Sequence, residues 1–119
     1  MIYKGVEIEG LWRTEHANDE QYIKVELNLN QKAHLLSGKM VIVGKDKDKD
    51  KALTFTAVGS LWEGYLVLNF HSDDRKFLSY ANGLLKVTGG GKNLTGYLNY
   101  GNIIDNGVVE SKSIEFNRA

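Results

Sequence analysis

The stretch Y-I-K-V-E-L-N-L, residues 22–29, alternates between two sets of side chains at every step. Its apolar set is Ile23, Val25, Leu27 and Leu29. Successive side chains of a β-strand point to opposite faces of a sheet, whereas a helix repeats its apolar residues every three or four positions. The stretch therefore predicts a β-strand that buries one face, as strands of antiparallel sheets do.

The same period-two pattern recurs along almost the whole chain. Eight strands are expected, at about residues 6–12, 22–29, 33–43, 52–60, 62–70, 77–88, 94–100 and 108–116. The sixth is long and is expected to carry a bulge near Asn82-Gly83. No segment has the apolar period of an amphipathic helix. The chain has no proline and 13 glycines, which suits continuous strand ladders joined by tight turns.

Strands of this length with short links predict an all-β fold, a small eight-stranded antiparallel up-and-down β-barrel with a lipocalin-like meander. A β-sandwich is the alternative fold, but it would want shorter strands and longer crossovers. The length of 119 residues predicts a single domain, residues 1–119. Its interior is expected to hold the large aromatic residues of the apolar faces. These are Trp12, Phe55, Trp62, Phe70 and Tyr100.

The connections are expected to sort by end, because alternate connections of an up-and-down barrel lie together. One end should hold both termini and three tight turns, at residues 30–32, 60–61 and 89–91. The opposite end should collect four longer polar connections, at residues 16–20, 44–51, 71–76 and 101–107. Binding residues concentrate on loops held by a rigid scaffold, so this second end is the predicted mouth for a ligand.

The charges balance, with 15 basic and 15 acidic residues and a formal net charge of zero. Proteins that bind duplex nucleic acid or anionic membranes along their surface carry an excess of Lys and Arg. We therefore expect no DNA or RNA partner, and membrane contact only through segments outside this sequence. The chain has no cysteine, so disulfides and cysteine-ligated zinc are excluded.

The run G-K-D-K-D-K-D-K, residues 44–51, has the aspartate spacing with which an EF-hand calcium loop begins. The sixth position of that loop needs glycine and is Lys51 here, and the twelfth needs glutamate and is Ala57. The run is therefore expected to be a solvated hairpin tip.

Other candidate sites are also incomplete. The run G-G-G-K, residues 89–92, lacks the helix that follows a phosphate-binding loop. The three histidines, His16, His34 and His71, have no metal-ligand spacing. No set of acid, base and nucleophile stands out. We expect no metal, no cofactor and a binding protein rather than an enzyme.

Two known families share patterns with the chain. The run Gly10-Leu11-Trp12 resembles the G-x-W signature of lipocalins, in which an arginine late in the chain covers the tryptophan, and Arg118 is placed for that role. Residues 6–118 more closely resemble the cyclic-dinucleotide receptor barrel of membrane-anchored CBASS antiphage effectors. That resemblance rests on I-E-G-L-W-R (8–13), L-N-Q-K (29–32), L-S-Y-A-N-G (78–83) and L-T-G-Y (94–97).

In the effector family, two transmembrane helices precede an eight-stranded barrel. The barrel binds a cyclic dinucleotide made by a partner nucleotidyltransferase on phage infection, the protein self-associates, and its helices disrupt the inner membrane. The resemblance implies that this chain is the receptor domain of a longer bacterial protein, on the cytoplasmic side of the inner membrane, and soluble as this fragment. It also implies a cyclic dinucleotide ligand and self-association on activation.

A cyclic dinucleotide needs partners for its phosphates and surfaces on which its bases stack. The candidate ligand-binding residues are Arg13 and Arg75 for the phosphates and Trp12, Tyr65 and Tyr80 for the bases or ribose. The sequence leaves open which ligand binds and whether it lies inside the barrel or at its rim.

Two alternative functions fit the pattern as well. The first is a carrier of a small apolar ligand, of the lipocalin or fatty-acid-binding type, although the heavy interior aromatics count against a roomy cavity. The second is a non-catalytic self-assembly module, for which exposed Tyr22 and Tyr97 would provide a contact surface.

Overall fold

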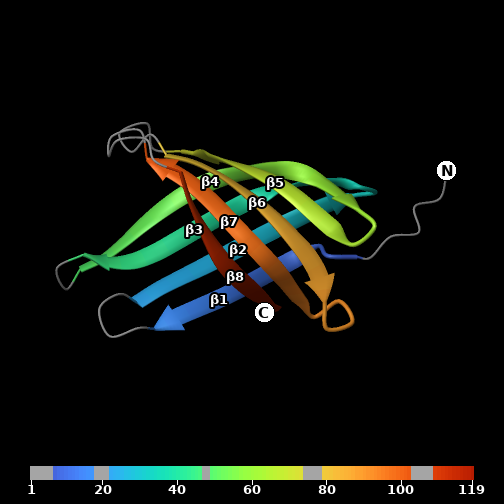
Figure 1. The fold of residues 1–119 in the computed structure, drawn as a ribbon, viewed down its shortest axis with the longest axis horizontal. Helices are drawn as coiled ribbons and strands as arrows, with labels where there is room; N and C mark the ends of the chain where they lie inside the picture. The colour runs from blue at the N-terminus through green and yellow to red at the C-terminus, as the bar shows by residue number, and fades with distance from the viewer. Residues whose placement is uncertain (1–6, 18–21, 47–48, 74–78, 103–108) are drawn as a thin grey trace.

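The computed structural model describes residues 7–17, 22–46, 49–73, 79–102 and 109–119, and it confirms the predicted barrel (Figure 1). The strands are β1 (Gly10–Ala17), β2 (Tyr22–Lys32), β3 (Leu35–Asp46), β4 (Lys49–Trp62), β5 (Tyr65–Ser72), β6 (Ser79–Thr88), β7 (Asn93–Asn102) and β8 (Val109–Arg118). Each pairs antiparallel with the next, and β8 returns to β1. Over the described ranges, no helix is long and apolar enough to cross a bilayer.

Three tight turns lie at one end of the barrel, on the right in Figure 1, as predicted. Two of them come later in the sequence than expected, at Ala33-His34 and Glu63-Gly64, while the third falls at residues 89–92. Glu63 and Gly64 both have positive φ, 51° and 83°, as the two central residues of a type I′ hairpin require. The strands therefore continue two or three residues beyond the polar positions predicted as turns.

Trp62 lies on the outer wall with 59% of its surface exposed, and its prediction as a core residue was wrong. The prediction grouped Trp62 with the residues of β5, whereas it ends β4 and pairs with Tyr65 across the two-residue turn. Paired residues share a face of the sheet. The buried pair is therefore Leu61 with Leu66, and Trp62 and Tyr65 both face outward.

The bulge expected near Asn82-Gly83 is not present. The register of β6 runs without a skip on both sides, with Gly83 opposite Leu68 on β5 and Leu98 on β7. Gly83 faces the interior, where the Phe70 ring comes within 3.6 Å of the position that a Cβ would occupy. This glycine therefore makes room for an aromatic side chain rather than a kink in the strand.

The lysine-aspartate run is mostly strand rather than loop. β3 continues to Asp46 and β4 begins at Lys49, and the register sets Lys45 opposite Asp50 and Asp46 opposite Lys49. The alternation in the sequence is thus complementary across this hairpin. Only residues 47–48 are left for the predicted tip, and they lie outside the described residues.

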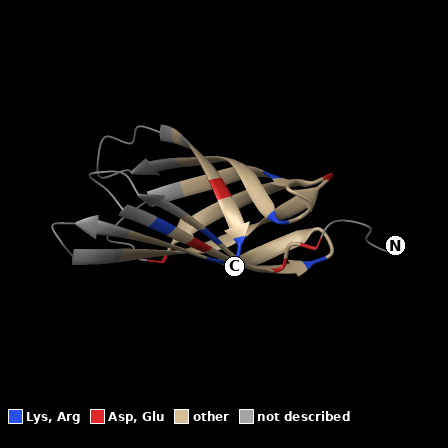
Figure 2. Cartoon of the chain, turned by 90° about the horizontal axis from the view of Figure 1, so that it is seen from below, with Lys and Arg blue, Asp and Glu red and all other residues tan. Residues whose placement is uncertain are grey.

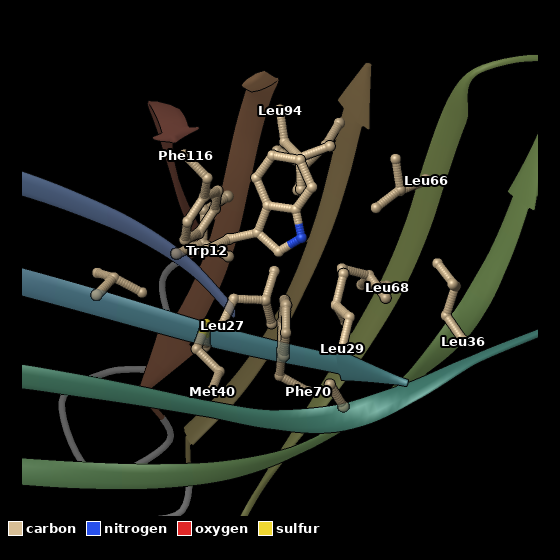
Figure 3. Packing of buried hydrophobic residues seen from close by; sticks show 14 of the residues in the cluster. Trp12, Leu27, Leu29, Leu36, Met40, Leu66, Leu68, Phe70, Leu94 and Phe116 are labelled. Carbon is tan, nitrogen blue, oxygen red and sulfur yellow. The ribbon is translucent and has the colours of Figure 1, made fainter. Parts of the chain in front are cut away.

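The interior at the end of the tight turns is filled with side chains. The Trp12 indole lies among Phe116, Leu94 and Leu27, and its ring is fully buried (Figure 3). The core residues are Ile8, Trp12, Val25, Leu27, Leu29, Leu36, Met40, Phe55, Ala57, Leu61, Leu66, Leu68, Phe70, Leu85, Leu94, Leu98, Ile114 and Phe116. The predicted burial of Trp12, Phe55 and Phe70 is confirmed, and the side chain of Tyr100 lies outside the described residues.

Glycine lets the strands bend closely over this core. A Cβ at Gly59, on β4, would overlap the carbonyl oxygen of Val67 and lie 3.0 Å from the Cα of Leu68, both on β5. The backbone of a paired strand cannot yield as a flexible side chain can, so this position accepts only glycine without a change in the ladder.

Replacing Gly59 with alanine is expected to reduce the free energy of unfolding by at least about 3 kcal/mol, because β4 and β5 must separate to admit the methyl group. The neighbouring change Ser60→Ala should cost roughly 0.5 kcal/mol or less, since Ser60 faces outward. Urea unfolding of both variants measures the difference. Equal midpoints would contradict the close approach of the two strands.

Candidate functional site

Of the five predicted ligand-binding residues, the structure describes the side chains of Trp12, Arg13 and Tyr65, and it does not bring these three together. Trp12 is buried at the closed end, where its Nε1 donates a hydrogen bond to the carbonyl of Ile8 at 2.9 Å. Tyr65 is exposed on the outer wall at that end, with the Lys86 ammonium 5.1 Å from its ring centroid. Arg75 lies outside the described residues. Tyr80 stands opposite His71 in β6, and its side chain is not among those described.

Arg13 is exposed on β1 and belongs to a small charged group. Its Nε lies 3.5 Å from Oε1 of Glu26, the residue opposite it on β2. The Nζ of Lys24 approaches the same carboxylate oxygen at 3.3 Å. Two cations therefore flank one carboxylate on the outer wall, and the group carries a net charge of +1. Elsewhere in the described chain, basic and acidic positions are interspersed (Figure 2).

Arg13 and Tyr65 are on opposite walls. β1 and β5 are four strands apart in a ring of eight, and both side chains point away from the interior. A single ligand cannot touch both, so the two residues cannot belong to one binding site. Among the predicted residues whose side chains are described, Arg13 is the one that is both exposed and charged.

Arg118 covers Trp12, as the lipocalin resemblance implied. The guanidinium carbon lies 4.5 Å from the centroid of the indole. The same guanidinium donates to the carbonyl oxygens of Glu7 at 2.7 Å, Glu9 at 3.0 Å and Gly91 at 3.4 Å. One side chain thus ties the last strand to the segment before β1 and to the β6–β7 turn. The face of an aromatic ring attracts a cation, so the contact with Trp12 adds to these hydrogen bonds.

Arg118 spans the seam between β1 and β8, along which the strands pair over a short distance. Within the described residues, β1 and β8 pair at two positions, Trp12 with Arg118 and Arg13 with Asn117. Backbone bonds from Arg118 to Lys92 at 3.1 Å and from Ala119 to Leu11 at 2.9 Å reinforce the same end. Residues 14–17 of β1 and 109–116 of β8 lie outside this ladder. The described ladder that closes the barrel between β1 and β8 is therefore near the termini.

A polar cluster on the outer wall was missed by sequence analysis. Lys39 donates from Nζ to Oδ2 of Asp73 at 2.7 Å and to the hydroxyl of Thr56 at 3.0 Å, and that hydroxyl donates to Oδ1 of Asp73 at 2.8 Å. The amide of Asp73 also donates to the carbonyl of Thr54 at 2.9 Å. The cluster fixes the chain just after β5. Its members are 17 residues or more apart, so no local motif announces it.

These bonds change the acidity of Asp73. The hydrogen bond from Lys39, followed by the one from Thr56, lowers the pKa of this carboxyl from its ordinary value of 3.8. Both donors prefer the ionised carboxylate. The group is a surface clamp that holds when Asp73 is charged.

The histidines do not form a metal centre in the described part of the chain. His34 packs against Trp62, with ring centroids 4.3 Å apart, and His71 faces outward opposite Thr56. The side chain of His16 is outside the described residues. Among described residues, no group of three or more His, Cys, Asp or Glu could hold a metal ion.

Replacing Arg118 with alanine is expected to lower the free energy of unfolding by roughly 2–4 kcal/mol, because the ring contact and the hydrogen bonds to three carbonyls are lost together. Arg118→Lys should be intermediate, since it keeps the charge without the planar fork. Lys32→Ala removes a charge at the same end and serves as the control. If Arg118→Ala unfolds at the same denaturant concentration as Lys32→Ala, the seam does not depend on this side chain.

The clamp at Asp73 predicts a pH dependence. Because the folded-state pKa is lowered, the clamp stabilises the protein above the unfolded value near 3.8, and this contribution disappears as the pH falls through the folded value. Asp73→Asn should therefore melt at most about 2 °C below the wild type at neutral pH, since the cluster is exposed. The difference in melting temperature between Asp73→Asn and the wild type should become smaller below about pH 4. Glu63→Gln, in an exposed turn, is the control. A gap that stays constant down to pH 2 would refute the assignment.

Comparison with known proteins returned no match to a family model, a curated protein or a solved structure.

Proposed function

We propose that the chain is a ligand-sensing β-barrel that binds a cyclic dinucleotide at the end away from its tight turns. The observation that supports this position for the ligand is that the described ladder between β1 and β8 consists of two residue pairs, both near the termini. At the other end the interior is filled around Trp12 and locked by Arg118, so no ligand of this size fits there. The ligand class comes from the resemblance of short runs along the chain to effector receptor barrels.

Arg13 is the phosphate contact that the described surface supports. It lies beside the last paired residues of the seam, opposite Asn117, and its guanidinium is accessible. A phosphodiester would compete with Glu26 for this guanidinium and would also meet the ammonium of Lys24. Arginine binds phosphate through paired hydrogen bonds, which suits a ligand with two phosphodiesters.

Arg75 and Tyr80 remain in the proposal through their place in the sequence, at the mouth end. Trp12 and Tyr65 are left out, because one is buried and the other lies on the opposite outer wall. In a longer protein of the effector type, ligand binding would drive self-association on the cytoplasmic side of the inner membrane, and membrane helices outside this sequence would then disrupt that membrane.

A carrier of an apolar ligand is less well supported. Such a protein needs a roomy cavity, and the described interior is occupied by side chains such as Met40, Phe70 and Phe116 that are almost wholly buried. A barrel of eight strands has an interior just wide enough for side chains to fill.

Calorimetric titration with a panel of cyclic dinucleotides tests the proposal. We expect binding of at least one, roughly 10-fold or more weaker in Arg13→Ala, because a charge-assisted hydrogen bond to phosphate is lost. Glu26→Gln should bind more tightly, since it removes the competing carboxylate. Lys32→Ala, at the closed end, should bind as the wild type does. Absence of heat and of any thermal shift with every nucleotide would refute the proposal.

A further inference from the structure

Asn117 faces the proposed phosphate contact, Arg13, across the seam between the first and last strands. It is exposed on β8 and pairs with Arg13 of β1 in the described ladder. Paired residues share a face of the sheet, and their Cβ atoms are about 4.5–5.5 Å apart. The amide of Asn117 and the guanidinium of Arg13 therefore extend from neighbouring positions on the outer wall, one on each side of the line along which the barrel closes.

Hydrogen bonds fix which end of the Asn117 amide is available to a ligand. The Nδ2 of Asn93, the residue opposite it on β7, donates to Oδ1 of Asn117 at 2.5 Å and to Oε1 of Glu115 at 3.4 Å. An ionised carboxylate only accepts hydrogen bonds, so Asn93 turns its NH₂ group toward Glu115, and Asn117 meets that group with its oxygen. The NH₂ group of Asn117 is left without an acceptor among the described residues.

The guanidinium of Arg13 also has donors to spare. Its described ion pair uses Nε, 3.5 Å from Glu26 on β2, which is the side away from β8. A guanidinium carries five N–H donors, four of them on its two Nη groups. Donors of Arg13 therefore remain for a ligand that approaches over the seam.

Arg13 and Asn117 together present donors, one set charged and one neutral, so a group that lies between them must accept. The non-bridging oxygens of a phosphodiester are acceptors and carry its negative charge, and hydrogen bonds to a charged acceptor are about twice as strong as those between neutral groups. Of the groups in a cyclic dinucleotide, the phosphodiester is thus the best match to this pair.

We infer that Asn117 is a second contact for the phosphodiester, so that the ligand bridges β1 and β8 across the seam. The inference rests on the proposed function. Asn93 is a positioning residue in this arrangement, because it holds the oxygen of Asn117 and so presents the NH₂ group to the ligand. A bound phosphodiester would tie together two strands whose described ladder has two residue pairs, and ligand binding would then stabilise the closure of the barrel.

A ligand held by Arg13 and Lys24 alone would act differently. These residues are on β1 and β2, which already pair at eight positions, so such a ligand would leave the seam unchanged. The amide of Ala119, which donates to the carbonyl of Leu11 across the seam at 2.9 Å, distinguishes the two arrangements. A ligand that bridges the seam should slow hydrogen exchange of this amide, because the strands must then release the ligand before they separate.

Calorimetric titration with cyclic di-AMP, cyclic di-GMP and cyclic GMP-AMP tests the inference. For a nucleotide that the wild type binds, Asn117→Ala should bind about 5- to 10-fold more weakly, because a hydrogen bond to a charged group is lost. Asn117→Asp keeps the shape of the side chain but sets a carboxylate beside the phosphate, so it should bind more weakly still. Asn93→Ala should bind roughly 2- to 3-fold more weakly, and it should cause no further loss in the Asn117→Ala protein, because Asn93 acts through Asn117.

A second amide pair on the outer wall provides a matched control. Asn99 of β7 donates from Nδ2 to Oδ1 of Asn82 on β6 at 3.0 Å. Its row continues to Asn69 on one side and to Ser111 on the other, so the pair has no charged residue beside it in the row. Asn99→Ala removes the same kind of hydrogen bond and should bind nucleotide as the wild type does.

Hydrogen exchange of the wild type, with and without nucleotide, tests the bridge without any variant. Bound nucleotide should slow exchange of the Ala119 amide several-fold. The amide of Val87, which donates to the carbonyl of Gly64 at 2.8 Å away from the seam, is the internal control and should change less. In Asn117→Ala saturated with nucleotide, the slowing at Ala119 should be lost.

The outcomes separate this inference from the proposed function. Equal affinities of Asn117→Ala and Asn99→Ala would overturn the inference and leave nucleotide binding in place, and so would an Ala119 amide that exchanges equally fast with and without nucleotide. Absence of binding by the wild type would refute the proposed function and the inference with it. Melting curves without nucleotide establish that each variant is folded.

Discussion

Closure of the sheet depends on the contact between Arg118 and Trp12. A barrel needs its first and last strands to meet, and here they share two residue pairs in the described ladder. Arg118 adds the bonds that the short ladder lacks, by donating to carbonyls of the segment before β1 and of the β6–β7 turn while it covers the indole. The packing of Phe116 and Leu94 beside Trp12 follows from this closure.

The two ends of the barrel differ in how much of their interior is filled and in where β1 and β8 pair. At the end of the tight turns, side chains fill the interior and leave it without space for a second molecule. Toward the other end, the described ladder between β1 and β8 extends to the pair of Arg13 and Asn117, and we propose that the ligand engages the barrel beyond this pair. A charged group of Arg13, Lys24 and Glu26 borders that seam. We propose a phosphate-bearing ligand because this charged group borders the seam and because the chain resembles the receptor barrels of the effector family.

The kinds of side chain on the outer wall also differ from strand to strand around the barrel. Charged side chains line β1 and β2, whereas the large apolar side chains that are exposed in the described chain lie on β3 to β7. The outer surface of β3 and β4 also carries Lys39 and Thr56, which hold Asp73 just after the end of β5.

The sequence by itself determined the all-β class, the eight strands and which end holds the tight turns, because alternation and turn residues are local properties of the chain. The resemblance to the lipocalin signature, rather than any local pattern, pointed to Arg118 as the residue that covers Trp12. Only the tertiary structure decided the side on which Trp62 lies. The turn is at residues 63–64 rather than 60–61, so Trp62 ends β4 instead of beginning β5, and the alternation of β4 places it outward. The separation of Arg13 from Tyr65 was likewise decided by strand pairing, because it depends on which strands become neighbours and no local pattern records that pairing.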